Sequence, residues 1–157
     1  MKHTIIVLVE NQPGVLARIV GLISGRGYNI ESLNVGPTHD PAVSRMTIQC
    51  PGDDRVLEQV TKQLNKLVDV IKVTDVTKQR FVDQELVLVK VTAAGDQRRQ
   101  IIDLVEIFDG KIVSVLPGSI VIRLADDQER VNDFLELMKA FRILDVGRSG
   151  VLAMGVD

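Results

Sequence analysis

The chain contains 157 residues with a formal net charge of −2, and 45% of them are hydrophobic, so it can form one medium or two small domains. The nearly balanced charge excludes a basic surface for nucleic acid and a polybasic segment for a membrane. No apolar run reaches the roughly 18 residues of a membrane-spanning helix. The single cysteine, Cys50, precludes an intrachain disulfide and fits a reducing compartment. Because a strand is expected within a few residues of Met1, we expect no signal peptide and a cytoplasmic protein.

The first expected elements are a strand, a tight turn and a short amphipathic helix. Residues 4–9 form the strand and carry apolar side chains on both of its faces. Residues 10–14, Glu-Asn-Gln-Pro-Gly, then interrupt it. Pro13 fixes φ and lacks an N–H group, and Gly14 tolerates any φ, so both suit a turn that opens a helix. The helix that follows has one broad apolar stripe.

The turn before this helix is suited to binding an anion. The first N–H groups of a helix have no partner within it, and the helix dipole favours negative charge there. Asn11 in the turn and Asn29 beyond the helix add amide side chains. A ligand with a carboxylate, an ammonium group and a small apolar side chain would fit these groups. An ordinary strand–turn–helix whose asparagines only cap it fits the same residues.

The rest of the first half completes a β-α-β-β-α-β pattern. Residues 29–35 and 44–50 are expected strands, and in the second one apolar and polar side chains alternate. Asp53 and Asp54 cap a helix whose apolar residues recur at intervals of three and four. A fourth strand, residues 70–76, ends the unit. This order is the split βαβ or ferredoxin-like pattern, an α+β fold.

The pattern then repeats in the second half. The expected elements are a strand at 85–92, a helix capped by Asp96, strands at 111–116 and 119–124, a helix after a capping box of Asp126 and Glu129, and a last strand at 143–153. Residues 93–96, Ala-Ala-Gly-Asp, replace the Asn-x-Pro-Gly turn of the first half. That difference argues against an amino-acid site at the second turn.

Two strands are apolar on both faces, which predicts a covered surface. In a four-stranded sheet with both helices on one side, the other face is bare. Residues 4–9 and 86–91 would then expose much apolar surface in a monomer. A second copy, the other domain or a partner protein is expected to cover it.

No catalytic or metal-binding constellation stands out. His3 and His39 are the only histidines and lie far apart in the sequence. Cys50 fits a packing residue at a strand end better than a nucleophile. The acidic pairs that precede the helices are better explained by capping than by acid–base chemistry. We therefore expect no catalytic site in this chain.

Several segments resemble a known family. ENQPGVLARIVGLISGRGYNIESLNVGPTHD is similar to the opening of an ACT domain, a small amino-acid-sensing module. With SRMTI, KQLNKLVDV, ELVLVKV, IFDGKIVSV and GRSGVLAMG, the whole chain resembles the small, regulatory subunit of acetolactate synthase, also called acetohydroxyacid synthase. The resemblance implies an ACT domain at residues 1–77, a linker at 78–84 and a C-terminal ferredoxin-like domain at 85–157.

The resemblance also implies a function without catalysis in this chain. The family's catalytic large subunit is a transferase that forms 2-acetolactate from pyruvate, in the biosynthesis of valine, leucine and isoleucine. Thiamine diphosphate, Mg²⁺ and FAD are expected in that partner, and no cofactor is expected here. The small subunit would activate the partner and confer feedback inhibition by valine.

The resemblance places the effector site where two ACT domains of a homodimer meet side by side. The residues carried over are Asn11, Gly14, Val15, Leu16, Asn29 and Ile30. Backbone N–H groups of residues 14–16 would hold the valine carboxylate, and the asparagines would contact polar atoms.

Two other functions are compatible with a βαββαβ pattern. A free-standing ACT-domain sensor that acts on transcription or on another enzyme remains an alternative. RNA-recognition domains share the βαββαβ order but stack bases on aromatic side chains of the sheet. Residues 44–50 contain no aromatic side chain and the net charge is negative, so the RNA-binding interpretation is set aside.

Overall fold

The computed structural model of the protein describes residues 2–157, which form two compact units. One unit contains the residues up to Val82 together with Val151–Asp157, and the other contains Asp83–Gly150. This division differs from the predicted one, because the last seven residues of the chain belong with the first unit. The two predicted βαββαβ units are confirmed.

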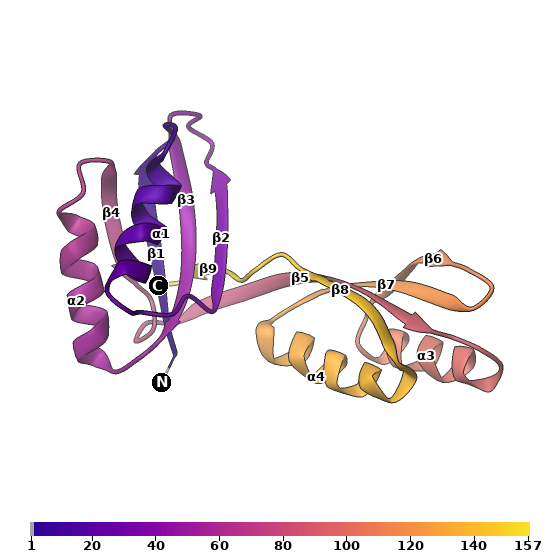
Figure 1. The fold of residues 1–157 in the computed structure, drawn as a ribbon. Helices are drawn as coiled ribbons and strands as arrows, with labels where there is room; N and C mark the ends of the chain where they lie inside the picture. The colour runs from indigo at the N-terminus through magenta and orange to yellow at the C-terminus, as the bar shows by residue number, and fades with distance from the viewer. Residues whose placement is uncertain (1) are drawn as a thin grey trace. The chain divides into compact units, whose positions relative to one another are not determined.

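The first unit is a four-stranded antiparallel sheet with two helices on one face (Figure 1). Its elements are β1 (Lys2–Glu10), α1 (Val15–Gly25), β2 (Ser32–Pro37), β3 (Val43–Pro51), α2 (Asp54–Asn65), β4 (Val70–Asp75) and, from the C-terminus, β9 (Leu152–Gly155). The strand order is β2-β3-β1-β4. Strand β2 is therefore an edge strand, and it begins three residues later than the sequence predicted.

The core of the first unit lies between this sheet and its helices. Alternate residues of β1 and β3 face the helices, and Ile5 lies opposite Ile48 in the antiparallel register. The buried residues of this core are Ile5, Val7, Val9, Val15, Ile19, Ile23, Met46, Ile48, Cys50, Leu57, Val60 and Leu64. The predicted alternation in β3 is confirmed, since its odd-numbered residues Arg45, Thr47 and Gln49 lie on the opposite face.

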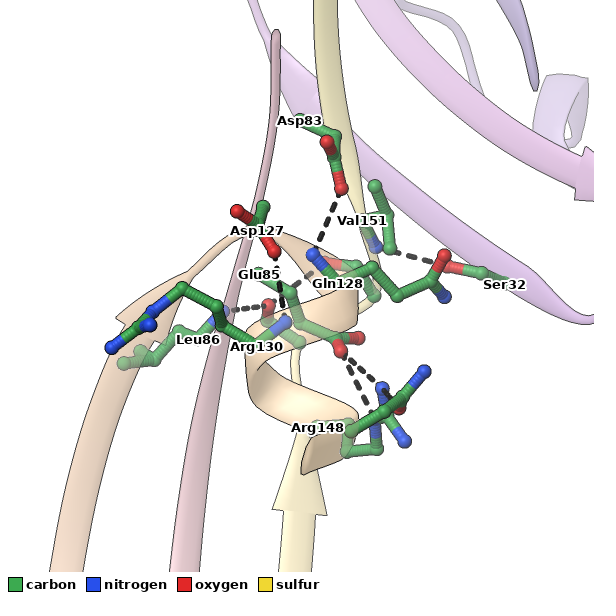
Figure 2. A network of polar contacts seen from close by, with 12 residues as sticks. Ser32, Asp83, Glu85, Leu86, Asp127, Gln128, Arg130, Arg148 and Val151 are labelled. Carbon is green, nitrogen blue, oxygen red and sulfur yellow. Dashed lines mark hydrogen bonds and ion pairs between the residues drawn. The ribbon is translucent and has the colours of Figure 1, made fainter. Parts of the chain in front are cut away.

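Part of that opposite face is covered by the C-terminal residues of the same chain. Ala153 packs in a small cluster with Ile6 and Val76, against which Phe81 also rests. The backbone N–H of Val151 donates to Ser32 Oγ at 2.9 Å, a bond drawn in Figure 2. The expectation that something covers β1 is thus met in part by β9, which lies in the segment predicted for the other domain, one of the three covers that the sequence left open.

The second unit repeats the arrangement with both helices on one face of its sheet (Figure 1). Its elements are β5 (Phe81–Thr92), α3 (Asp96–Ile107), β6 (Lys111–Val115), β7 (Ser119–Asp126), α4 (Gln128–Met138), the 3₁₀ turn η1 (Lys139–Phe141) and β8 (Ile143–Arg148). The strand order is β6-β7-β5-β8. Phe134, fully buried, packs edge-on against Phe108 with ring centroids 5.2 Å apart.

Two boundaries differ from the prediction. The expected linker at 78–84 is only partly a linker, because β5 already begins at Phe81. The expected last strand at 143–153 is two strands, β8 and β9, separated at Gly150, whose φ of +82° breaks the extended backbone. The glycines of this segment had marked the predicted strand as interrupted.

Two predicted helix caps are also displaced by one residue. Gly95 is the N-cap of α3, so Asp96 is its first helical residue. Asp127, and not Asp126, caps α4 by accepting a hydrogen bond from the Arg130 N–H at 2.8 Å. The prediction that Asp53 caps α2 is confirmed by its bond from the Val56 N–H at 3.0 Å.

A polar network joins the start of β5 to α4 and β8 within the second unit (Figure 2). Asp83 Oδ2 accepts a hydrogen bond from the Gln128 N–H at 2.9 Å, next to the α4 N-terminus. The Glu85 carboxylate, whose side chain is 3% exposed, accepts two bonds from the Arg148 guanidinium at 2.5 and 3.0 Å. A buried carboxylate requires such a partner, so this pair holds β8 beside β5 in one register.

Candidate effector site

The turn between β1 and α1 leaves helical N–H groups available. Gly14 is the N-cap of α1 and has φ +83° and ψ −7°, a left-handed conformation that glycine adopts without a steric penalty. The Val15 N–H donates weakly to Gln12 O at 3.4 Å, and the Arg18 N–H donates to Gly14 O at 3.0 Å. Within residues 2–157, the Leu16 N–H has no hydrogen-bond partner. The helix N-terminus can therefore accept an anion.

Asn11 fastens this turn to the loop between β2 and β3. Its backbone N–H donates to Ala42 O at 2.8 Å, and its side-chain Nδ2 donates to Pro41 O at 3.0 Å. The side-chain Oδ1 has no partner within the described part of the chain and can still accept a hydrogen bond. Asn11 therefore has a structural role in addition to any contact with a ligand.

A small cavity lies beside the turn, between β1, α1 and the edge strand β2. Its volume is about 70 Å³. It is lined by Val9, Glu10, Asn11, Gln12, Val15, Leu16, Val35, Ser44 and Met46. Three predicted site residues, Asn11, Val15 and Leu16, thus meet at one cavity. Leu16 and Val35 remain 44% and 41% exposed, so an apolar rim surrounds it.

Arg18 lies next to the glycine of the turn. Its Nε and Nη2 both contact Asp69 Oδ2 at 2.7 Å, which ties α1 to the start of β4. A Cβ atom at Gly14 would lie 3.0 Å from Arg18 Nη1. The space over Gly14 is therefore limited by this guanidinium as well as by the backbone conformation.

Three predicted residues, Gly14, Asn29 and Ile30, do not line the cavity in the single chain. Asn29 is exposed and precedes β2, and within the described residues it makes no hydrogen bond. Ile30 packs against the core of the first unit. The prediction that Asn29 and Ile30 belong to the edge strand was wrong, because pairing with β3 begins only at Ser32.

Sequence reasoning missed Val35 and Ser44 as lining residues. Val35 lies opposite Met46 in the register of β2 and β3, so both face the helix side. The alternation of β3 could have placed Ser44 there, but its position beside the turn depends on pairing with β1. Strand pairing of this kind is not encoded in a local pattern.

The thiol of Cys50, the single cysteine, is buried in the first unit. Burial raises the pKa of the Cys50 thiol, and the negative charges of Asp75 and Glu31 raise it further. Residues 2–157 contain no group of three or more His, Cys, Asp or Glu side chains that could hold a metal ion. None of the helices in this part of the chain is long and apolar enough to cross a membrane.

Comparison with known proteins identifies the family. Residues 5–72 match the AHAS small subunit-like ACT domain, and residues 84–157 match the small subunit of acetolactate synthase. The chain is 49% identical over 154 residues to the probable acetolactate synthase small subunit of Archaeoglobus fulgidus, covering 98% of this chain and 96% of that one. The chain belongs to the family of acetolactate synthase small subunits.

Other members agree along nearly the full length. The isozyme 3 small subunit of Escherichia coli is 45% identical over 155 residues, which are 98% of this chain and 95% of the relative. The crystal structure of the acetolactate synthase small subunit from Thermotoga maritima superposes with a TM-score of 0.91 at 35% identity, covering 99% and 98% of the two chains. The ACT-domain and small-subunit resemblances drawn from the sequence are thus confirmed.

Proposed function

We propose that this small subunit binds the catalytic large subunit, raises its activity and makes it sensitive to valine through the turn before α1. The observation that carries the proposal is the cavity beside free helical N–H groups. The N–H groups at residues 14–16 would hold the ligand carboxylate, and Asn11 Oδ1 would accept a bond from its ammonium group. Val15, Leu16 and Val35 would surround the isopropyl group.

The size of this cavity supports a site completed by a second copy. Pockets that enclose a whole ligand have volumes of about 300 Å³ or more, whereas this one has about 70 Å³. The exposed apolar rim, Leu16 and Val35, borders the edge strand β2. A homodimer formed side by side through α1 and β2 would cover that rim and bring Asn29 of one copy toward the turn of the other.

The preference for valine rests on the family resemblance. One methylene group in an apolar pocket changes binding by only about 1–3 kcal/mol. Leucine and isoleucine would therefore bind the same site, with free energies of binding within about 1–3 kcal/mol of that of valine. The alternative of a free-standing sensor is less well supported, because the relatives along the full length are named as enzyme subunits.

Reconstitution with the large subunit tests the proposal. We expect the wild-type chain to increase acetolactate formation and to make it inhibitable by valine. In Leu16→Asp, an acid near the helix N-terminus is tolerated by the fold but occupies the donors that the ligand needs. This variant should still activate the enzyme, but it should lose valine inhibition and heat of valine binding.

A matched control distinguishes the site from a general effect of charge. Leu137 on α4 is also helical and 44% exposed, and it lies in the second unit. Leu137→Asp should retain the normal valine response. A normal response in Leu16→Asp would exclude this turn as the effector site, and a wild-type chain that does not bind the large subunit would overturn the function itself.

A further inference from the structure

A second and larger hollow lies on the other face of the first sheet. It has a volume of about 540 Å³ and belongs entirely to the first unit. It is lined by Leu8, Asn34, Gly36, Pro37, Thr38, His39, Asp40, Val43, Arg45, Leu152 and Met154. Its size lies within the range of about 300–1,000 Å³ that is typical of small-molecule sites. The proposed function makes no use of it.

The walls of this hollow, the β9 groove, are mainly aliphatic. Leu8 and Val43 contribute from β1 and β3, and Leu152 and Met154 contribute from β9. Leu152 is 49% exposed and Met154 is 61% exposed, and both lie on the same face of β9. A thioether side chain adapts readily to the shape of a ligand, so this wall suits an aliphatic group.

One cation, Arg45, lines the groove. Its Nη1 donates to Thr47 Oγ1 at 3.2 Å and its Nη2 donates to Ala153 O. Within the described residues it forms no ion pair with a carboxylate, which leaves N–H donors and a full positive charge uncompensated. Burial lowers the pKa of this guanidinium, a sign that it is partly removed from water.

The acid on the rim does not neutralise this cation. Asp40 Oδ1 accepts a hydrogen bond from the Ala42 N–H at 3.0 Å and thereby stabilises its own loop. Thr38 Oγ1 is likewise engaged within that loop, by the Asp40 N–H at 3.2 Å and the Val43 carbonyl at 2.9 Å. Thr38 Oγ1 and Asp40 Oδ1 are thus engaged within the loop, and Arg45 is the cation that faces the groove.

We propose that the β9 groove binds a small aliphatic carboxylate, with the carboxylate at Arg45 and the hydrocarbon chain against Leu8, Leu152 and Met154. A guanidinium forms two parallel hydrogen bonds with a carboxylate, and such bonds are strongest where water is partly excluded. An apolar ligand without a carboxylate would leave the partly desolvated Arg45 guanidinium without an ion-pair partner. An anion without an apolar part would leave the aliphatic walls of the groove exposed to water.

This site is distinct from the turn before α1. Leu8 and Arg45 lie on one face of the sheet, whereas Val9 and Ser44, which line the effector cavity, lie on the other. Ligands should therefore be able to occupy the two sites at the same time. The inference also does not depend on the regulatory function, because it concerns binding by the isolated chain.

Methyl NMR with sodium octanoate is the direct test. We expect saturable shifts of the Leu8, Val43, Leu152 and Met154 methyl groups, and little change at Leu16 and Val35. Octan-1-ol, which has the same chain without the charge, should bind at least tenfold more weakly. Equal binding of the alcohol, or shifts confined to Leu16 and Val35, would overturn the proposal.

A space-filling substitution tests the location without touching Arg45. Gly36 lines the groove, and a Cβ atom built on it has no neighbour within 4 Å. Gly36→Phe should fold normally and abolish the octanoate shifts. Gly147 in β8 is equally unobstructed and lies in the second unit, so Gly147→Phe should leave binding unchanged.

Removing the cation tests the charge. Arg45→Met keeps an aliphatic stem and should weaken octanoate binding by roughly tenfold or more, while the affinity for octan-1-ol is retained. Unchanged octanoate binding in Arg45→Met would overturn the assigned role of this residue. Groove methyl shifts that appear only with the catalytic large subunit, and never with octanoate, would show a protein-docking surface instead and refute a carboxylate site.

Discussion

The turns that open α1 and α3 stand at equivalent places in two units of the same topology, yet the hollows beside them are lined differently. Both turns end on a glycine with positive φ, Gly14 at +83° and Gly95 at +58°. In the first unit the cavity lies between a strand, a helix and an edge strand. In the second unit the hollow beside the turn is lined by residues 95–103 alone, along one helix surface.

The two turns also differ in the contacts of an arginine. In the second unit, Arg98 Nη2 donates to Ala93 O at 3.1 Å, Leu116 O at 2.7 Å and Pro117 O at 3.0 Å. The guanidinium thereby ties the turn to the β6–β7 hairpin. In the first unit, Arg18 pairs instead with Asp69, which ties α1 to the start of β4, and its Nη1 limits the space over Gly14. The same topology therefore holds its two turns by different arginine contacts.

The largest expected effect is the loss of stability when a residue of one core is truncated while the other core stays intact. Phe134 is fully buried in the second core, so Phe134→Ala should destabilise that unit by about 3–5 kcal/mol. Because the first unit has its own core, heat of valine binding should persist. Tyr28, the only tyrosine in a chain without tryptophan, packs on the first core and reports its unfolding in urea.

The matching variant is Ile19→Ala, since Ile19 is fully buried in the first core. It should move the unfolding transition seen by Tyr28 fluorescence to lower urea concentration. Phe134→Ala should leave that transition in place and move only the part of the circular dichroism transition that Tyr28 fluorescence does not follow. Coincident shifts of both signals in both variants would mean that the units unfold as one cooperative body.

The comparison also clarifies what the sequence could and could not reveal. Periodicity placed the elements because helices and half-buried strands carry different spacings of apolar residues. Asn11 was singled out because a turn before a helix is a local motif, whereas Val15 and Leu16 were carried over from the family resemblance. Ser32 and Val151 meet through a hydrogen bond between residues 119 positions apart, and no local pattern encodes such a pairing. The β9 groove remained hidden for the same reason.

Glycine substitution at the two turns tests their difference at the level of function. Gly14→Asp should abolish valine inhibition, because its carboxylate competes for the helical N–H groups. An acid near a helix N-terminus is favourable, but φ at this position is +83°, which strains any residue other than glycine, so stability should also fall by about 1–2 kcal/mol. Enzyme assays with the reconstituted variant and urea unfolding measure both effects.

Gly95→Asp is the control for strain. Its φ of +58° and ψ of −132° form a conformation that other residues rarely adopt, so stability should fall by about 1–3 kcal/mol. The valine response should nevertheless remain, because the hollow beside the second turn is lined by residues 95–103 alone. A lost response in Gly95→Asp, or a retained one in Gly14→Asp, would contradict the assignment of the two turns.

Asn29→Ala should weaken valine binding without changing the stability of the fold. The side chain is exposed, and within residues 2–157 it makes no hydrogen bond, so urea unfolding should be unchanged. If Asn29 reaches the turn of a second copy, calorimetry should show a loss of about 1–3 kcal/mol in valine binding. Asn65, exposed at the end of α2, provides the matched control, and Asn65→Ala should bind valine normally. Equal affinities in the two variants would remove Asn29 from the site.

The smallest expected effect concerns a difference between the two cores. In the second unit the buried Glu85 carboxylate is paired with Arg148, whereas in the first unit His3 lies fully buried opposite Cys50. Neither of its ring nitrogens has a hydrogen-bond partner within the described residues. A buried polar group without a partner has lost its bonds to water and gained none in return, so the folded state is penalised.

His3→Leu removes that penalty and should raise the free energy of unfolding by about 1 kcal/mol in urea titrations. Thr4→Val is the neighbouring control, because Thr4 Oγ1 is also buried but accepts a hydrogen bond from Gln49 Nε2 at 3.3 Å. Thr4→Val removes a hydrogen bond that the folded state makes, so this variant should lose stability while His3→Leu gains it. A loss in both variants would mean that the imidazole is hydrogen-bonded in solution, and the apparent difference between the two cores would disappear.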